Sequence, residues 1–178
     1  MFDKAAFLAS LKHEAKILKH LAAQLTPAHL DYRPTPAQRS TLELLRYLTI
    51  AGSAALEYAI TGTWDHWEAT EKRSADVDLA SFPKAIDRQL KSIEKALAGY
   101  TDAKLRRART RTFAGVEMTL GAGLVEMVLK QFTAYRMQLF LYAKSAGLAQ
   151  LGTSDLWAGR SPKPPKPAKK AKAAKTSG

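Results

Sequence analysis

Residues 120–146 read LGAGLVEMVLKQFTAYRMQLFLYAKSA, and this stretch decides the fold class. Its large side chains recur at intervals of three and four residues, which places them on one face of an α-helix. The stripe consists of Leu124, Val128, Gln131, Phe132, Tyr135, Leu139 and Tyr142. The spacing therefore predicts one long helix, and Gly147 is a typical residue to end it.

A second amphipathic helix is predicted for residues 4–24. The apolar stripe is Phe7, Leu8, Leu11, Ala15, Leu18, Leu21, Ala22 and Leu25. Lys12, Lys16 and Lys19 lie off this stripe, so only one face of the helix is expected to be buried. Pro27 ends the helix because proline has no backbone N–H to donate.

Ser40 and Glu43 mark the start of a further helix, which we expect to run unbroken to about Ile60. In a capping box the serine side chain accepts from the third helical N–H, and the glutamate reaches back to the serine N–H. Small residues on this helix allow another helix to approach closely; they are Ala51, Gly52, Ala55 and Ala59. Residues 81–97 predict one more helix, with Pro83 in its first turn.

Two connecting segments lack a clear helical pattern. Residues 62–80 are polar and aromatic, and we interpret them as a loop. In residues 105–119, arginines alternate with small residues, and Ala114-Gly115 is suited to a turn. This second segment predicts a short β-hairpin.

Four helices without a sustained strand pattern predict an all-α fold, an antiparallel four-helix bundle, with the hairpin between the third and fourth helices. We assign the bundle domain to residues 1–159. Residues 160–178 read RSPKPPKPAKKAKAAKTSG and contain no aromatic or large aliphatic side chain. Such a segment has nothing to bury, so a disordered, basic, Lys/Pro/Ala-rich C-terminal tail is expected.

The composition excludes several kinds of site. There is no cysteine, which rules out disulfides, thiolate metal sites and cysteine nucleophiles. The net charge is +12, and residues 160–178 contribute seven basic residues and no acidic ones. We find no signal-peptide pattern and no apolar stretch of the roughly 18 residues that a membrane span needs, so we expect a cytoplasmic protein with no membrane partner.

Three stretches together resemble one known family. Residues 25–43, LTPAHLDYRPTPAQRSTLE, are similar to the connection between the first two helices of DinB-like proteins. Residues 44–48, LLRYL, are similar to the family's Leu-Leu-x-His-Leu, and residues 131–147, QFTAYRMQLFLYAKSAG, to its His-x-x-x-His-Arg-x-Gln-Leu. Their order and spacing match over residues 1–147, so the chain resembles the DinB-like four-helix bundles.

The resemblance implies that a metal site has been lost. Typical members hold a divalent metal on three histidines, and the matching positions here are Tyr47, Gln131 and Tyr135. A neutral phenol and an amide are poor ligands for zinc or nickel. We therefore expect no metal and no cofactor, and the family's metal-dependent hydrolase or thiol-transferase chemistry is not carried over.

These three polar side chains form a candidate ligand pocket. Two hydroxyls and an amide can satisfy one another's hydrogen bonds, or they can hold a small polar ligand. A satisfied polar plug inside the bundle is the interpretation we favour over the pocket. His66, beside Asp65 and Glu68, is a secondary candidate site, although its segment can equally be a loop anchored by tryptophans.

The remaining ionisable residues have plain structural interpretations. His13 and His20 lie seven residues apart on the first helix, and we expect both to be solvated. Glu57 and Glu126 are expected on solvated faces or in ion pairs.

The lysines of the tail are candidates for weak, sequence-independent phosphate binding. They are Lys163, Lys166, Lys169, Lys170, Lys172 and Lys175, with a second basic patch at Lys104, Arg106, Arg107, Arg109 and Arg111. No aromatic residue is interleaved in the tail, so base stacking is not expected there. The alternative is a solubilising terminal extension, which we favour.

Three functional hypotheses follow. The first is a non-catalytic, metal-free DinB-like bundle that binds a small ligand or acts as an interaction domain. The second is an enzyme of the same superfamily with a relocated or metal-independent site. The third is a nucleic-acid-associated protein that acts through its tail. The resemblance also implies pairing of two bundles into a homodimer.

Overall fold

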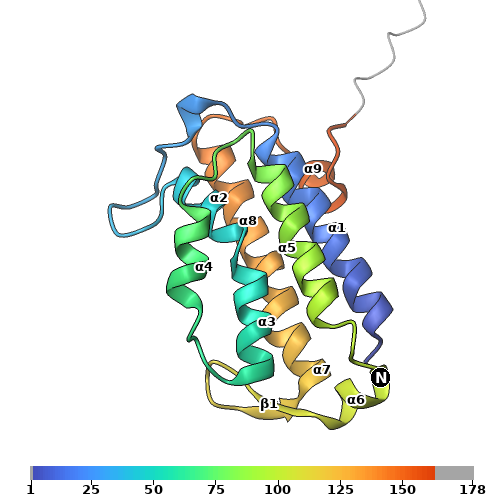
Figure 1. The fold of residues 1–178 in the computed structure, drawn as a ribbon. Coiled ribbons are helices and arrows are strands. Elements are labelled where there is room, and N and C mark those ends of the chain that lie inside the picture. The colour runs from blue at the N-terminus through green and yellow to red at the C-terminus, as the bar shows by residue number, and fades with distance from the viewer. Residues whose placement is uncertain (1, 163–178) are drawn as a thin grey trace, which may run out of the picture.

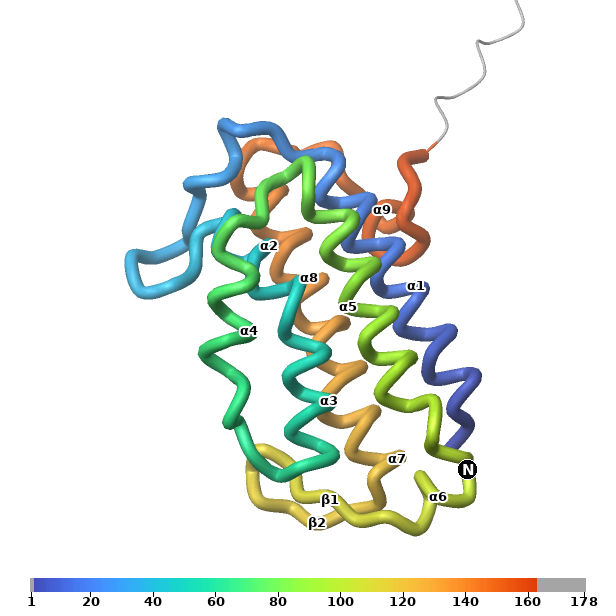
Figure 2. Tube along the Cα trace, viewed as in Figure 1, coloured from blue at the N-terminus to red at the C-terminus, as the bar shows by residue number. Residues whose placement is uncertain are grey.

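Four helical segments pack side by side to form the body of the protein in this computed structural model, which describes residues 2–162 (Figures 1 and 2). The four are α1 (Lys4–Ala22), then α2 (Thr41–Leu48) with α3 (Ala51–Thr61), then α5 (Phe82–Ala96), and finally α7 (Leu120–Gly123), a π-helical turn at Leu124–Leu129 and α8 (Lys130–Ser145). The predicted all-α, antiparallel bundle is confirmed. Its interior is aliphatic, with Leu11, Leu45 and Leu139 fully buried.

Helix α1 begins and ends close to the predicted positions. The Asp3 side chain accepts a hydrogen bond from the Ala6 N–H at 3.0 Å and so caps the first turn. Leu11, Leu18 and Leu21 are fully buried where α1 packs against α5 and α8. A 3₁₀ turn at Pro27–His29 then leads into the connection to α2.

The capping box at the start of α2 is confirmed. The Glu43 N–H donates to the Ser40 hydroxyl at 3.2 Å, and the Ser40 N–H donates to the Glu43 carboxylate at 2.7 Å. The prediction that this helix continues unbroken to Ile60 is wrong. Helix α2 ends at Leu48 and α3 begins at Ala51, so the second helical segment of the bundle has a break at Thr49 and Ile50.

A side chain from α5 bridges this break. The Gln89 Oε1 accepts from the backbone N–H groups of Gly52 at 2.8 Å and Ser53 at 3.1 Å. Its Nε2 donates to the Leu48 carbonyl at 2.8 Å. In a regular helix Gly52 would donate directly to Leu48, so the Gln89 amide is inserted into the backbone ladder, which is a known cause of helix kinks.

Helix α3 packs closely against the fourth helix just after the break. A Cβ atom on Gly52 would collide with the Phe132 ring, so only glycine leaves room for Phe132 at this place. The expectation that small residues on this helix permit close approach is therefore confirmed at Gly52.

Residues 62–80 are not simply a loop, because they contain α4 (Trp67–Ser74). The buried positions of this helix are Thr70 and Ser74, and Val77 is buried just beyond it. Since two of these three side chains are small and polar, the segment has no apolar stripe to reveal a helix. Helix α4 lies beside α2 and α3 (Figure 1).

The predicted β-hairpin is confirmed. Strands β1 (Arg109–Arg111) and β2 (Glu117–Thr119) are antiparallel, with Thr110 opposite Met118, and Gly115 lies in the turn with φ of 81°. The Thr110 hydroxyl donates to the Ala59 carbonyl at 2.7 Å, which ties the hairpin to α3. The strand-like pattern does not begin at Leu105, however, because that residue belongs to the short helix α6 (Asp102–Arg107).

A last short helix, α9 (Thr153–Ala158), was not predicted and lies against α1. His20 Nε2 lies 2.8 Å from the Asp155 carboxylate, and Asp155 is fully buried. The exposed His13 hydrogen-bonds to the Trp157 carbonyl at 2.9 Å. His20 is therefore not a solvated residue, because it helps to hold α9 on α1.

Two further sequence predictions concern the C-terminal tail and membrane-spanning helices. The tail from residue 163 onward lies outside the described residues, so its predicted disorder stays a prediction. Across residues 2–162 no helix has both the length and the apolar character needed to cross a membrane.

Gln89→Leu tests the bridged break. The change leaves two buried N–H groups and one buried carbonyl without their partner, so we expect the free energy of unfolding to fall by about 2 kcal/mol or more. Urea denaturation measures this value. Lys91→Leu, at an exposed position of the same helix, is the control and should change it by less than about 0.5 kcal/mol. Equal effects of the two changes would mean that the helix closes the break without Gln89.

The contacts of Asp155 predict an acid-sensitive attachment of α9. Burial alone raises the pKa of Asp155, but the Gly152 N–H, His20 and the Ser161 hydroxyl together lower it below its ordinary value. Because the pKa of Asp155 in the folded protein lies below the ordinary value of 3.8, its ionised carboxylate stabilises the fold above pH 3.8. This stabilisation is lost as the pH falls below that value. Between pH 7 and pH 3 Asp155→Asn should therefore lose less stability than the wild type. Asp76→Asn, at an exposed position, should behave as the wild type, and an unchanged acid profile of Asp155→Asn would contradict the assignment.

Candidate functional site

Tyr47 of α2 and Tyr135 of α8 meet inside one end of the bundle. Their ring centroids are 4.8 Å apart, with an edge-to-face angle of 65°. Gln131 lies one helical turn before Tyr135, on the same face of α8. The structure thus brings two of the three predicted site residues into contact and places the third next to them in the helix.

Tyr47 is enclosed on its other sides as well. The Arg39 guanidinium lies over its ring at 4.1 Å, and the Trp67 ring of α4 is 6.2 Å away. Burial raises the pKa of Tyr47, the neighbouring Tyr135 raises it further, and Arg39 lowers it only in part. The phenol is therefore neutral at physiological pH, with a hydroxyl that can donate or accept a hydrogen bond.

Gln131 carries an unmet acceptor. Its Oε1 atom is buried and has no hydrogen-bond partner within residues 2–162. A buried acceptor without a donor costs about 1–3 kcal/mol. Within the described residues the cluster is therefore not a fully satisfied polar plug.

The side chains of Tyr47, Gln131 and Tyr135 do not suit the divalent metal ion that the resemblance to DinB-like proteins implies. A neutral phenol and a carboxamide are weak ligands for zinc or nickel. Within residues 2–162 no group of three or more histidine, cysteine or acidic side chains is arranged to hold a metal ion. Metal chemistry is therefore not assigned to Tyr47, Gln131 and Tyr135.

A hollow of about 290 Å³ lies beside Tyr47, between α2 and α4. Charged side chains of both signs line it. They include Arg39, Glu43, Arg46 and Glu71. Glu43 is engaged by Ser40 and Arg33, whereas Glu71 forms no ion pair within residues 2–162. The hollow therefore offers two guanidinium groups and one uncommitted carboxylate next to the Tyr47 ring.

His66 lies apart from Tyr47. Its side chain is 71% exposed, and its Nε2 is 3.4 Å from the Glu57 carboxylate. The adjacent Trp67 packs on Tyr47, while Trp64 stacks on Tyr58 with centroids 4.7 Å apart. This agrees with a segment anchored by its tryptophans. Glu126 forms an exposed pair with Lys130, as the sequence suggested for a solvated helix face.

Arg136, which the resemblance places in the fourth-helix motif, has a structural role here. It is fully buried, and its Nη1 lies 3.2 Å from the Glu14 carboxylate of α1. Burial raises the pKa of Glu14 more than Arg136 lowers it. The guanidinium also faces the Trp157 ring at 4.8 Å, so this residue joins α8 to α1 and α9.

The basic patch predicted near the hairpin is partly engaged within the protein. Lys104 lies over the Tyr100 ring, Arg106 donates to the Phe2 carbonyl, and Arg111 pairs with Glu117. Arg107 and Arg109 are exposed. The six candidate lysines of the tail lie outside the described residues.

Comparison with solved structures identifies the architecture. A DinB-like protein of Bacillus subtilis, YjoA, superposes with a TM-score of 0.60 and 17% identity over 83% of this chain and 96% of its own. A putative DinB family member from Exiguobacterium sibiricum gives a TM-score of 0.63 and 19% identity over 87% of this chain and 99% of its own. The fold is DinB-like. No protein-family model and no curated protein matches the sequence.

Within this DinB-like fold, sequence reasoning missed the residues that surround Tyr47. Three separate segments supply Arg39, Arg46 and Glu71. Glu71 belongs to α4, in the segment that the sequence predicts as a loop. The available signal was Arg46, which directly precedes Tyr47 in the LLRYL motif.

Restoring histidines tests the proposed convergence on this site. The variant with Tyr47→His, Gln131→His and Tyr135→His should bind zinc or nickel, because two imidazoles at i and i+4 of α8 then face one from α2. Metal content after titration and dialysis is the measurement, with the wild type and Tyr47→His alone as controls. Modest affinity is expected because orienting partners for the new histidines are missing. A folded triple variant that binds no better than the single one would contradict the convergence.

Proposed function

We propose that this chain is a metal-free DinB-like bundle that binds a small polar molecule beside the cluster of Tyr47, Gln131 and Tyr135, in the hollow that Tyr47 lines. The observation that carries the proposal is the hollow of about 290 Å³ against Tyr47, lined by charged groups of both signs. Its volume lies at the lower end of the range of small-molecule pockets, which begins at about 300 Å³.

The side chains around the hollow favour a zwitterion as the ligand class. The Arg46 Nε donates to the Val77 carbonyl at 3.1 Å, which holds the guanidinium in place and leaves its terminal N–H groups for a carboxylate. Glu71 supplies a negative charge for an amine.

An amino-acid panel tests the proposal. Backbone amide spectra of the ¹⁵N-labelled protein are recorded with amino acids, simple amines and simple carboxylates. Amino acids should shift the signals of residues 46, 47 and 71 in a saturable way, and Arg46→Gln should weaken this binding about tenfold, the effect of losing about 1.4 kcal/mol. Lys84→Gln, at an exposed position of α5, is the control. The proposal fails if no member of the panel produces saturable shifts at these residues.

The other hypotheses rest on separate observations. An enzyme with a relocated site would use His66 and Glu57, which lie 3.4 Å apart. Nucleic-acid binding rests on the tail lysines from Lys163 to Lys175 and on the exposed Arg107 and Arg109. Homodimer formation, the domain limit at residue 159 and a cytoplasmic location stay predictions.

A further inference from the structure

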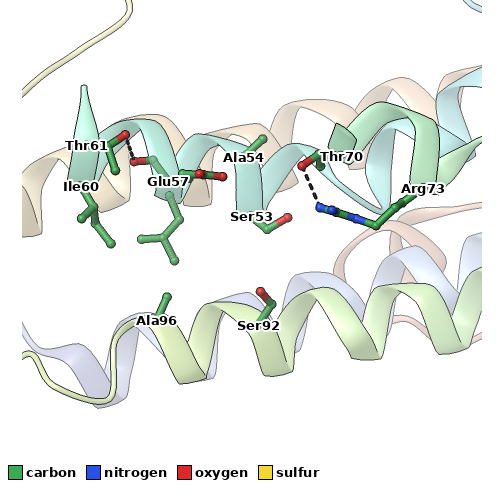
Figure 3. A pocket seen from close by; sticks show the side chains of 10 residues that line it. Ser53, Ala54, Glu57, Ile60, Thr61, Thr70, Arg73, Ser92 and Ala96 are labelled. Carbon is green, nitrogen blue, oxygen red and sulfur yellow. Dashed lines mark hydrogen bonds between the residues drawn. The ribbon is translucent and has the colours of Figure 1, made fainter. Parts of the chain in front are cut away.

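A second hollow lies between α3 and α5 (Figure 3). It measures about 250 Å³, and its polar lining includes Ser53, Ser92, Thr70 and Arg73. A further hollow of about 270 Å³ shares these four residues and adds Arg88 and Gln89. The two hollows therefore form one groove, named here the α3–α5 groove. Helix α4 lines it with Thr70 and Arg73, and it lines the Tyr47 hollow with Glu71 and Ser74.

Short side chains create the groove. Ser53 of α3 lies opposite Ser92 of α5 in Figure 3, and Ala54 and Ala96 also line the groove. Larger aliphatic residues at these four positions would fill the space between the two packed helices. Two of these four residues carry hydroxyls. The Ser53 hydroxyl donates to the Ile50 carbonyl at 2.9 Å and keeps its acceptor lone pairs, and the Ser92 hydroxyl has no hydrogen-bond partner within residues 2–162.

Arg73 is held in position at the groove but is not neutralised. Its Nη2 donates to the Thr70 hydroxyl at 2.8 Å, and Thr70 itself is buried. Within residues 2–162, neither Arg73 nor Arg88 lies within ion-pair distance of a carboxylate. In the same part of the chain Arg33, Arg111 and Arg136 are all paired with glutamates. The groove thus collects two guanidinium groups that form no ion pair within the described part of the chain.

This combination of groups matches one ligand chemistry. A planar guanidinium donates two parallel hydrogen bonds to a carboxylate or phosphate, and nearby hydroxyls donate to the remaining oxygens. The opposite end of the groove is different, because Glu57 and Ile60 line it there. An anionic head near Arg73 and Arg88, with a neutral or cationic remainder toward Glu57, fits this distribution of charge.

We infer that the α3–α5 groove is a second binding site, one that takes small molecules through an oxyanion group held by Arg73 and Arg88. The site differs from the Tyr47 hollow in its charged groups, since Arg39, Arg46 and Tyr47 do not line it. The two are neighbours, because Ile50 and residues of α4 line both.

Titration of the ¹⁵N-labelled full-length chain with inorganic phosphate, and separately with acetate, tests this inference at constant ionic strength. Saturable shifts are expected at residues 53, 70, 73 and 92. Arg73→Gln and Arg88→Gln should each weaken binding about tenfold, and Arg73→Lys should give an intermediate loss, because it keeps the charge without the planar fork. Lys84→Gln is the matched charge control on α5. A response to phosphate alone assigns the site to phosphate esters, and a response to acetate assigns it to carboxylates.

Two results would overturn the inference. One is a set of shifts that does not saturate with either ion. The other is saturable binding that Arg73→Gln and Arg88→Gln leave unchanged while their melting temperatures show that both variants are folded. Arg46→Gln separates the two proposed sites, because it should weaken amino-acid binding at Tyr47 about tenfold and leave phosphate or acetate binding in the groove unchanged.

Discussion

The amide of Gln89, inserted between Leu48 and Gly52, is the contact on which the arrangement of the bundle depends. It satisfies three backbone groups at the break between α2 and α3, and it comes from a different helix. At the start of α3, Gly52 leaves room for the Phe132 ring against its backbone because it has no Cβ atom. Ser53, which also donates to Gln89, then lines the α3–α5 groove. A single buried side chain thus connects the helix break, the packing of α8 and the shape of a surface hollow.

A second set of contacts holds the opposite side of the bundle. Arg136 is buried against Glu14 and faces Trp157, while His20 holds the buried carboxylate of Asp155. A buried ion pair contributes little net stability, but removing one partner is costly because the other charge is left uncompensated. These residues therefore specify how α1, α8 and α9 fit together. In this chain Arg136 has a role in packing, although it directly follows Tyr135 of the ligand-binding candidate cluster.

Helix α4 contributes side chains to both hollows that are proposed as binding sites. It places Trp67 against Tyr47, Glu71 in the Tyr47 hollow and Arg73 in the α3–α5 groove. At the three positions where DinB-like proteins typically have histidines, the chain has the Tyr47–Tyr135 pair and Gln131. The Gln131 Oε1 atom has no hydrogen-bond donor within residues 2–162. The two hollows beside α4 are lined by Glu71, Arg73 and Arg88, which form no ion pair within residues 2–162. The proposed recognition of charged small molecules rests on these side chains.

The sequence alone determined those features whose causes are local. Helical spacing in residues 4–24 and 120–146, the Ser40 capping box and the hairpin turn at Gly115 depend on neighbours a few residues away, and the structure confirms each of them. Family resemblance named Tyr47 and Tyr135 as neighbours, and their rings are in contact. Only the tertiary structure decided the break at Thr49 and Ile50, because Gln89 lies 41 residues from Leu48 in sequence. The same holds for α4, whose buried Thr70 and Ser74 leave no apolar pattern, and for the groove, since no sequence pattern shows that Ser53 and Ser92 line the same space.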